Sequence, residues 1–292
     1  MPYIKVYKGF GSPTQVHIMG HLFQGSGDFD FPITSNPWKN AWYMIKRFTV
    51  STIANTQVQL ALSDGTTIET TTNENGFFHF NIEGVFQIQL IGNISASGCN
   101  TIEIKIPIKT PKQVLISDID DTILVSHSTN FLKKIHTLLS KNSRARVPFT
   151  NTVDFFNQWN LNEENQVIYV SSSEWNLYDF LIDFIVFNKL PLAPMLLQDL
   201  KSGAKDLLFS GSGTHLHKFQ KLVIIADTYK ESKLILIGDS GQMDLDIYYR
   251  FAVEHPHLID GIYIRNVKRN SNKIKRYRSR FEELGIGLTQ LN

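Results

Sequence analysis

Carboxylates follow short apolar runs in this sequence, at positions where they could act together on a phosphate ester. Asp118 and Asp120 come directly after one run, and Asp239 follows another. A carboxylate can attack phosphorus to give an aspartyl-phosphate, and a second carboxylate two residues on can protonate the leaving alkoxide and then activate water. Asp-x-Asp-x-Thr is a weak signal by itself, and a solvated acidic loop is the alternative for residues 118–122.

The same region has the ligand types of a magnesium site. Mg²⁺ prefers octahedral oxygen ligands from a few carboxylates, waters and substrate phosphate. Without a cation, clustered carboxylates would repel a phosphate dianion. We therefore expect Mg²⁺ as the cofactor, held by Asp118, Asp120 (through its backbone carbonyl), Asp239 and Asp244. An ordinary strand-exit turn with a helix cap is the alternative for residues 238–244.

Hydroxyl and ammonium groups beside the other apolar runs could bind the phosphate. Ser171 follows the run at 167–170 and precedes an expected helix near 174, so its hydroxyl and the helix amides could hold a phosphate oxygen. Ser172 and Ser173 are also typical N-cap residues. Lys218 could neutralise the aspartate nucleophile and the transferring phosphoryl group. Lys221 competes for this assignment, and a solvated lysine is the alternative.

The elements that must position these groups alternate regularly. Continuous apolar runs at 114–116, 167–170, 234–237 and 262–264 are typical of parallel strands buried on both faces. Expected helices at about 150–159, 175–188, 216–228 and 243–254 separate them. This alternation predicts a three-layer α/β domain over residues 113–292, with its ligand site beyond the carboxyl ends of the strands.

Residues 1–112 show a different pattern. Short segments alternate apolar and polar residues and are separated by turn-forming residues, which predicts β-strands. These segments are 16–19, 58–62, 77–80, 86–90 and 102–106. The absence of a helical period favours an all-β sandwich domain. Pro107 and Pro111 mark the boundary. Trp38 and Trp42 are expected in its core, although they could also anchor a protein partner.

Composition excludes several classes of protein. The chain has 292 residues, of which 42% are hydrophobic, so neither global disorder nor a collagen-like chain fits. The net charge of +2 does not call for nucleic acid. Cys99 is the sole cysteine, which excludes an intrachain disulfide and favours a reducing compartment. The N-terminus lacks the apolar core of a signal peptide, so we expect a cytoplasmic protein.

The order of the motifs resembles that of the haloacid dehalogenase superfamily of phosphotransferases. The resemblance implies a Rossmannoid sheet with a small cap inserted at about 124–149. It also implies Asp118 as nucleophile, Asp120 as acid and base, and Asp239 as a Mg²⁺ ligand. Thr122, Ser171, Ser172, Lys218 and Arg265 are the residues expected to bind the substrate.

Longer strings narrow the resemblance to the actin-patch-type phosphatidate phosphatases, and VYKGFG at 6–11 resembles the start of the β-domain in bacterial-type members of that family. YVSSSEWNLY at 169–178 and GDSGQMDLDIY at 238–248 carry it, although Ser172 and Glu174 depart from the usual Asn and Pro. The resemblance implies Mg²⁺-dependent hydrolysis of phosphatidate to diacylglycerol and phosphate. The alternatives are a haloacid-dehalogenase-type phosphatase acting on a soluble ester, phosphopeptide or inositol lipid, and a non-catalytic module that binds a lipid headgroup.

Phosphatidate lies in a bilayer, so the resemblance also implies peripheral contact with an anionic membrane. Residues 131–139 place apolar side chains at helical spacing beside lysines. Residues 265–280 hold eight Lys and Arg and no acid, and each such cation near an anionic leaflet is worth ~1 kcal/mol. The alternatives are a cap helix packed on the core and a solvated or RNA-binding basic tail. We expect no nucleic acid, and the sequence names no protein partner.

Overall fold

The computed structural model describes residues 2–25, 51–120, 122–123, 152–162, 164–199, 214–267 and 270–291. The expected cap at 124–149, Trp38 and Trp42 lie outside the described residues. The chain divides into two compact units. The first comprises residues 1–31, 46–110 and 199–208, and the second comprises residues 32–45, 111–198 and 209–292.

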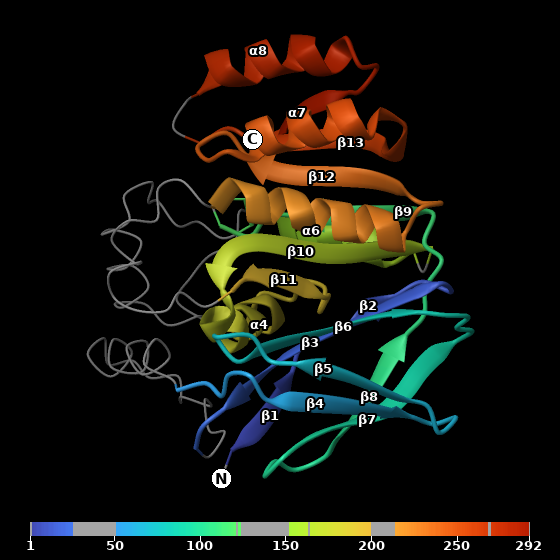
Figure 1. Ribbon diagram of the computed structural model, residues 1–292. Helices are drawn as coiled ribbons and strands as arrows, with labels where there is room; N and C mark the ends of the chain where they lie inside the picture. The colour runs from blue at the N-terminus through green and yellow to red at the C-terminus, as the bar shows by residue number, and fades with distance from the viewer. Residues whose placement is uncertain are drawn as a thin grey trace. The chain divides into compact units, whose positions relative to one another are not determined.

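The first unit contains two four-stranded sheets whose strand pairs are all antiparallel. In one, β3 (Gln15–Phe23) pairs with β1 (Tyr3–Val6), β2 (Phe10–Gly11) and β6 (Phe77–Glu83) (Figure 1). In the other, the order is β5 (Thr67–Thr71), β4 (Gln57–Leu62), β7 (Gln89–Ala96) and β8 (Ile102–Pro107).

One hydrophobic core joins these two sheets. Val58 and Leu60 on β4 are buried, while Gln57 and Gln59 between them are exposed, as expected for a strand with one solvated face. Buried side chains of β3 and β6 belong to the same core cluster. Four of the five predicted strands are therefore confirmed. The prediction at 86–90 is only partly right, because β7 begins at Gln89.

The second face of β3 carries histidines instead of aliphatic side chains. His17 Nδ1 is hydrogen-bonded to His79 Nε2 at 2.9 Å, and His21 Nδ1 to the Tyr7 hydroxyl at 2.9 Å. Burial lowers the pKa of both His17 and His21 to about 3, with smaller contributions from His79 and Lys5 respectively. These histidines are therefore neutral in the folded chain at physiological pH.

Acidification is expected to destabilise the fold. Because the folded-state pKa values lie below the unfolded value of about 6.5, the unfolded chain binds protons first, and stability is lost as the pH falls from about 6.5 toward 3. Between pH 7.5 and 5.5 the free energy of unfolding should fall by roughly 1–3 kcal/mol. Urea unfolding at the two pH values measures this loss. The variant His17→Phe should lose less stability on acidification than the wild type, and the control variant His257→Gln, at an exposed position, should lose as much as the wild type. Equal losses of stability in the two variants would show that the buried histidines are not the cause.

The second unit is built on a six-stranded sheet in which every pair is parallel. The order is β11 (Met195–Gln198), β10 (Asn165–Glu174), β9 (Gln113–Ser117), β12 (Lys233–Asp239), β13 (Ile259–Arg265) and β14 (Leu288–Leu291) (Figure 1). The chain starts in the centre at β9 and reverses direction between β11 and β12, so β9 and β12 flank a topological switch point. The α/β fold and its parallel sheet were predicted correctly.

Helices cover this sheet, and the four predicted ones are confirmed. They are α3 (Thr152–Asn160), the 3₁₀ turn η2 (Trp175–Leu177) continued by α4 (Tyr178–Phe187), α6 (Thr214–Thr228) and α7 (Asp244–Glu254). A further 3₁₀ turn, η3 (Pro256–Leu258), and α8 (Ser271–Glu282) follow. Here α6 packs on β10, α7 on β12, and α8 on β14. Across the described ranges, no helix is long and apolar enough to cross a membrane.

Candidate active site

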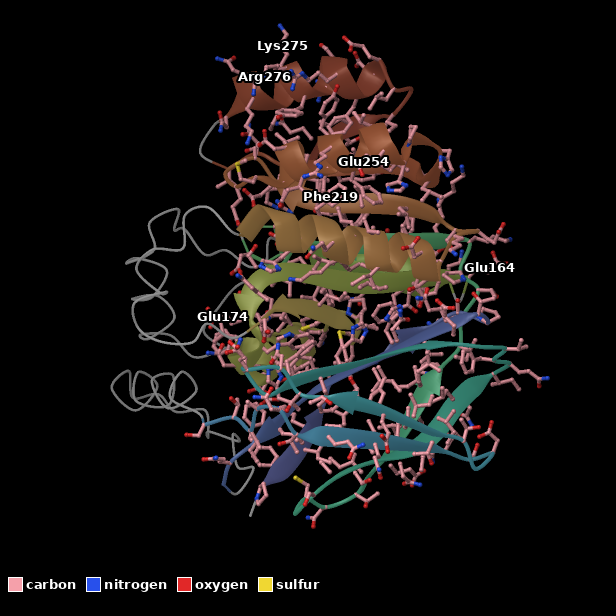
Figure 2. The ribbon with its side chains drawn as sticks, viewed as in Figure 1. Glu164, Glu174, Phe219, Glu254, Lys275 and Arg276 are labelled. Carbon is pink, nitrogen blue, oxygen red and sulfur yellow. The ribbon has the colours of Figure 1, made fainter. Side chains whose placement is uncertain are left out.

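The candidate site lies at the carboxyl edge of the parallel sheet. Ser117 of β9 is in register with Tyr169 of β10 and Ile237 of β12, so the residues just beyond these three positions lie at the same edge of the sheet. Figure 2 marks the two edges, with Glu164 before the start of β10 and Glu174 at its end. The motifs predicted at the strand ends are therefore neighbours in the fold.

Three carboxylates meet at this edge. Asp118, Asp239 and Asp244 are buried, and each offers one oxygen such that the three oxygens lie within 4.8 Å of one another. Asp244 follows β12 on the first turn of α7, and its Oδ2 accepts a hydrogen bond from the Asp239 amide at 3.0 Å. This separation is short enough for the three carboxylates to share a single divalent ion.

The hydrogen bonding of Asp239 fits a metal ligand. Its Oδ1 accepts from the amides of Gly241 at 2.6 Å and Gln242 at 2.8 Å. Its Oδ2 is buried and has no hydrogen-bond partner among the described residues. Leaving a buried carboxylate oxygen unpaired is costly, and a bound cation would remove that cost. Hard oxygen donors of this kind suit Mg²⁺.

The electrostatics of the cluster also favour a cation. Burial raises the pKa of Asp118 well above its usual value; Lys218 opposes this shift, and the charges of Asp244, Asp239 and Asp120 add to it. Burial, followed by the charge of Asp244, raises the pKa of Asp239 to about 7. Carboxylates with raised pKa values gain by binding a proton or a metal ion.

Lys218 is the lysine that joins the carboxylates. Its Nζ lies 3.0 Å from Asp118 Oδ1 and also donates a hydrogen bond to Asp244 Oδ1. Burial acts to lower the pKa of Lys218, but Asp118 and Asp244 outweigh it and raise the pKa well above its usual value. The ammonium therefore stays charged. Lys221, its competitor in the sequence, instead donates to the Ser171 carbonyl oxygen at 2.8 Å.

Asp120 faces two serines from the end of β10. Its Oδ2 accepts hydrogen bonds from Ser173 Oγ at 2.8 Å and Ser171 Oγ at 3.4 Å. Ser172 lies between them and is half-buried; alternation along an extended strand directs it to the opposite face. Sequence reasoning missed Ser173, which it took for an N-cap. Because the strand continues to Glu174, Ser171 and Ser173 lie on the same face of it. This spacing of two residues is the sequence signal that could have identified Ser173.

Thr122 and Arg265 are buried beside Asp118 and its loop. Thr122 Oγ1 donates to Asp118 Oδ2 at 3.2 Å, and Arg265 Nε donates to the Thr122 carbonyl oxygen at 3.0 Å. Gln242 Nε2 donates to the Asp120 carbonyl oxygen at 3.1 Å. These contacts hold the loop after β9 against the ends of β12 and β13.

Comparison with known proteins places the second unit in one family. Residues 113–266 match the family model described as phosphatidate phosphatase APP1, catalytic domain. The chain is 31% identical over 160 residues to phosphatidate phosphatase APP1 of Saccharomyces cerevisiae and 29% identical over 161 residues to an uncharacterised protein of Schizosaccharomyces pombe. Each alignment covers 52% of this chain and 25% of the relative, so the match spans about a quarter of each relative's length.

Two solved structures resemble the chain distantly. A component of the Pnkp1/Rnl/Hen1 complex aligns over 56% of this chain and 54% of its own, with 13% identity and a TM-score of 0.38. A carbohydrate acetylesterase from Xanthomonas citri aligns over 96% of this chain and 65% of its own, with 7% identity and a TM-score of 0.33. Neither likeness informs the chemistry of the site.

Proposed function

This chain belongs to the family of phosphatidate phosphatase APP1 catalytic domains, and from that premise we propose that it is a Mg²⁺-dependent phosphatidate phosphatase of haloacid-dehalogenase type. It would hydrolyse phosphatidate to diacylglycerol and phosphate through an aspartyl-phosphate. The observation that carries the proposal is the meeting of Asp118, Asp239 and Asp244 around Lys218 at one edge of the sheet. Residues 113–292 would form the catalytic domain, and residues 1–112 an accessory β-sandwich.

In the first step an Asp118 oxygen attacks phosphorus and the bond to the lipid oxygen breaks. Lys218 offsets charge on Asp118 and on the transferring phosphoryl group. Asp118, Asp239, Asp244 and the carbonyl of Asp120 would hold Mg²⁺, which when bound offsets the charge of the phosphate and the carboxylates. Thr122 donates to the second oxygen of Asp118 and so orients the nucleophile.

Asp120 carries the proton in both halves of the reaction. It donates a proton to the leaving alkoxide and then takes one from the water that attacks the aspartyl-phosphate. Ser171 and Ser173 hold its Oδ2 and thereby fix its direction. We propose that Ser171, Thr122 and Arg265 also contact the phosphate or its glycerol ester. Ser172, which the sequence also suggested, lies on the opposite face of the strand and is left out of this set.

A phosphate-release panel tests this function. The wild-type protein should release phosphate from phosphatidate in mixed micelles with Mg²⁺, and chelation should abolish the reaction. Soluble phosphomonoesters, a phosphopeptide and an inositol lipid should react more slowly. Faster turnover of any of these would move the assignment to another phosphatase activity, and binding to phosphatidate liposomes without turnover would indicate a headgroup-binding module.

We propose that the enzyme is cytoplasmic and that the basic helix α8 is the surface for its peripheral contact with a membrane. Its apolar side chains Ile274, Tyr277 and Phe281 are buried, while Lys275 and Arg276 are exposed (Figure 2). Because the apolar face is already packed, the helix would attract an anionic leaflet by charge rather than by insertion.

Removing two of these charges is expected to weaken membrane binding. At ~1 kcal/mol per cation, Lys275→Gln combined with Arg276→Gln should reduce binding to phosphatidate-containing vesicles by roughly 30-fold at low salt. Co-sedimentation with vesicles measures the change. The control, Lys105→Gln combined with Lys112→Gln, removes two exposed lysines elsewhere and should change binding much less. Equal losses in the two double variants would assign the binding to net charge alone.

A further inference from the structure

The end of β10 leaves the regular ladder just where it meets Asp120. On one side, pairing with β9 ends at Tyr169, opposite Ser117. On the other side, the register with β11 shifts between Val170 and Glu174. The stretch 171–173 therefore lies beyond one ladder and within the irregularity of the other. Contacts from outside the sheet can therefore set the position of this stretch.

Lys221 supplies such a contact. Its Nζ donates to the Ser171 carbonyl oxygen at 2.8 Å, and the helix that carries it, α6, packs on β10. Lys221 comes three residues after Lys218, so both side chains leave the same face of the helix. Burial and, to a smaller extent, the charge of Lys218 lower the pKa of Lys221 to about 7, although Asp118 opposes them. Lys221 is half-buried, and an amine shielded from water gains more from an accepting carbonyl than an exposed one does.

A chain of hydrogen bonds connects this lysine to Asp120. The Ser171 carbonyl accepts from Lys221, and the Ser171 hydroxyl oxygen accepts from the Ser173 amide at 2.9 Å. Both serine hydroxyls reach the same oxygen of Asp120. A shift of Ser171 would therefore move both partners of that carboxylate together.

We propose that Lys221 is a positioning residue that fixes Ser171, so that Ser171 and Ser173 hold Asp120 in the direction from which it protonates the leaving group. This inference rests on the proposed phosphatase function. Lys221 does not touch the reacting atoms; it acts through the strand end. The bond from phosphorus to the ester oxygen breaks as the bond to Asp118 forms, and the proton passes from Asp120 to that oxygen.

Comparing substrates with different leaving groups distinguishes this positioning role of Lys221 from a purely structural one. An alkyl phosphate such as phosphatidate needs a proton on its leaving alkoxide, whereas p-nitrophenyl phosphate releases a stable phenolate and needs far less help. The value of kcat/KM reports the steps through departure of the alcohol, before water attacks. Loss of Asp120 alignment should therefore lower kcat/KM for the alkyl ester selectively.

The experiment compares three variants on both esters. Lys221→Met should lower kcat/KM by about 10–100-fold for phosphatidate and by less than about 3-fold for p-nitrophenyl phosphate. Lys221→Arg keeps a donor and should recover most of the loss. The control Lys233→Met removes another lysine–carbonyl bond, from Lys233 Nζ to the His257 carbonyl oxygen at 2.6 Å, and should leave both values unchanged.

A double variant adds a second readout. Because Lys221 is inferred to act through Asp120, Lys221→Met should have little further effect on phosphatidate turnover in the Asp120→Asn background. Equal losses on both esters, additive losses in the double variant, or no loss at all would overturn the inference. A wild-type protein inactive on every ester would overturn the proposed function and this inference with it. An active wild type with an unaffected Lys221→Met overturns only the inference.

Discussion

Replacing Asp118 with Asn is expected to lower phosphate release from phosphatidate by at least about 10³-fold, because the amide cannot form the covalent phosphoryl intermediate. The folded structure should survive the change. Asp118 is 2% exposed and accepts from Thr122 Oγ1 while pairing with Lys218, and an amide oxygen can take over one of these contacts. Removing one of several crowded carboxylates also relieves repulsion.

Phosphate release and the thermal midpoint should be measured on the same preparation of Asp118→Asn. The matched control is Asp154→Asn, which makes the same chemical change at an exposed position on α3 and should keep wild-type turnover. A folded Asp118→Asn protein that turns over at the wild-type rate would exclude Asp118 as the nucleophile.

Replacing Asp239 with Asn is expected to abolish both Mg²⁺-dependent activity and stabilisation by Mg²⁺. The unpaired, buried Oδ2 of Asp239 is the atom best suited to a cation. Wild-type protein at a Mg²⁺ concentration of ~100 times its dissociation constant should gain about 2.7 kcal/mol in free energy of unfolding. Without metal, Asp239→Asn should be at least as stable as the wild type above pH 7, because burial raises the pKa of this carboxyl to about 7.

Thermal unfolding with and without Mg²⁺ measures this effect independently of turnover. Asp227→Asn is a suitable control, because Asp227 is exposed on α6 and should leave the Mg²⁺ response intact. An Asp239→Asn protein that Mg²⁺ stabilises as strongly as the wild type would show that the ion binds elsewhere.

Much of the sheet and of the candidate site could be predicted because burial on both faces leaves a clear sequence signal. The runs at 114–116, 167–170, 234–237 and 262–264 all lie within parallel strands. Since parallel strands end at the same edge, polar residues after three of the runs had to be neighbours. The convergence of Asp118, Ser171 and Asp239 on one edge follows from that argument.

The contacts within the site could not be predicted in the same way. Lys218 and Lys221 lie on the same face of α6, so helical periodicity cannot tell which of them contacts the carboxylates. The packing of α6 on β10 decides this. Ser171 and Ser173 both reach Asp120 because β10 continues to Glu174, whereas the sequence suggested Ser173 as a helix N-cap. Such details depend on where an element ends to within one or two residues.

Five short strands and one helix were also missed. The strands β1, β2, β5, β11 and β14 have two to five residues each, too few for a periodic pattern to stand out. Helix α8 was read only as a basic segment, although Ile274, Tyr277 and Phe281 have the spacing of one helical face. Its many charged residues masked that spacing.

Trapping of the phosphorylated enzyme tests the central claim most directly. Wild-type protein quenched during turnover of phosphatidate, then reduced with borohydride, should carry homoserine at position 118, identified by peptide mass spectrometry, and Asp118→Asn should carry none. Rapid phosphate release with no modification at position 118 would contradict an aspartyl-phosphate at this residue.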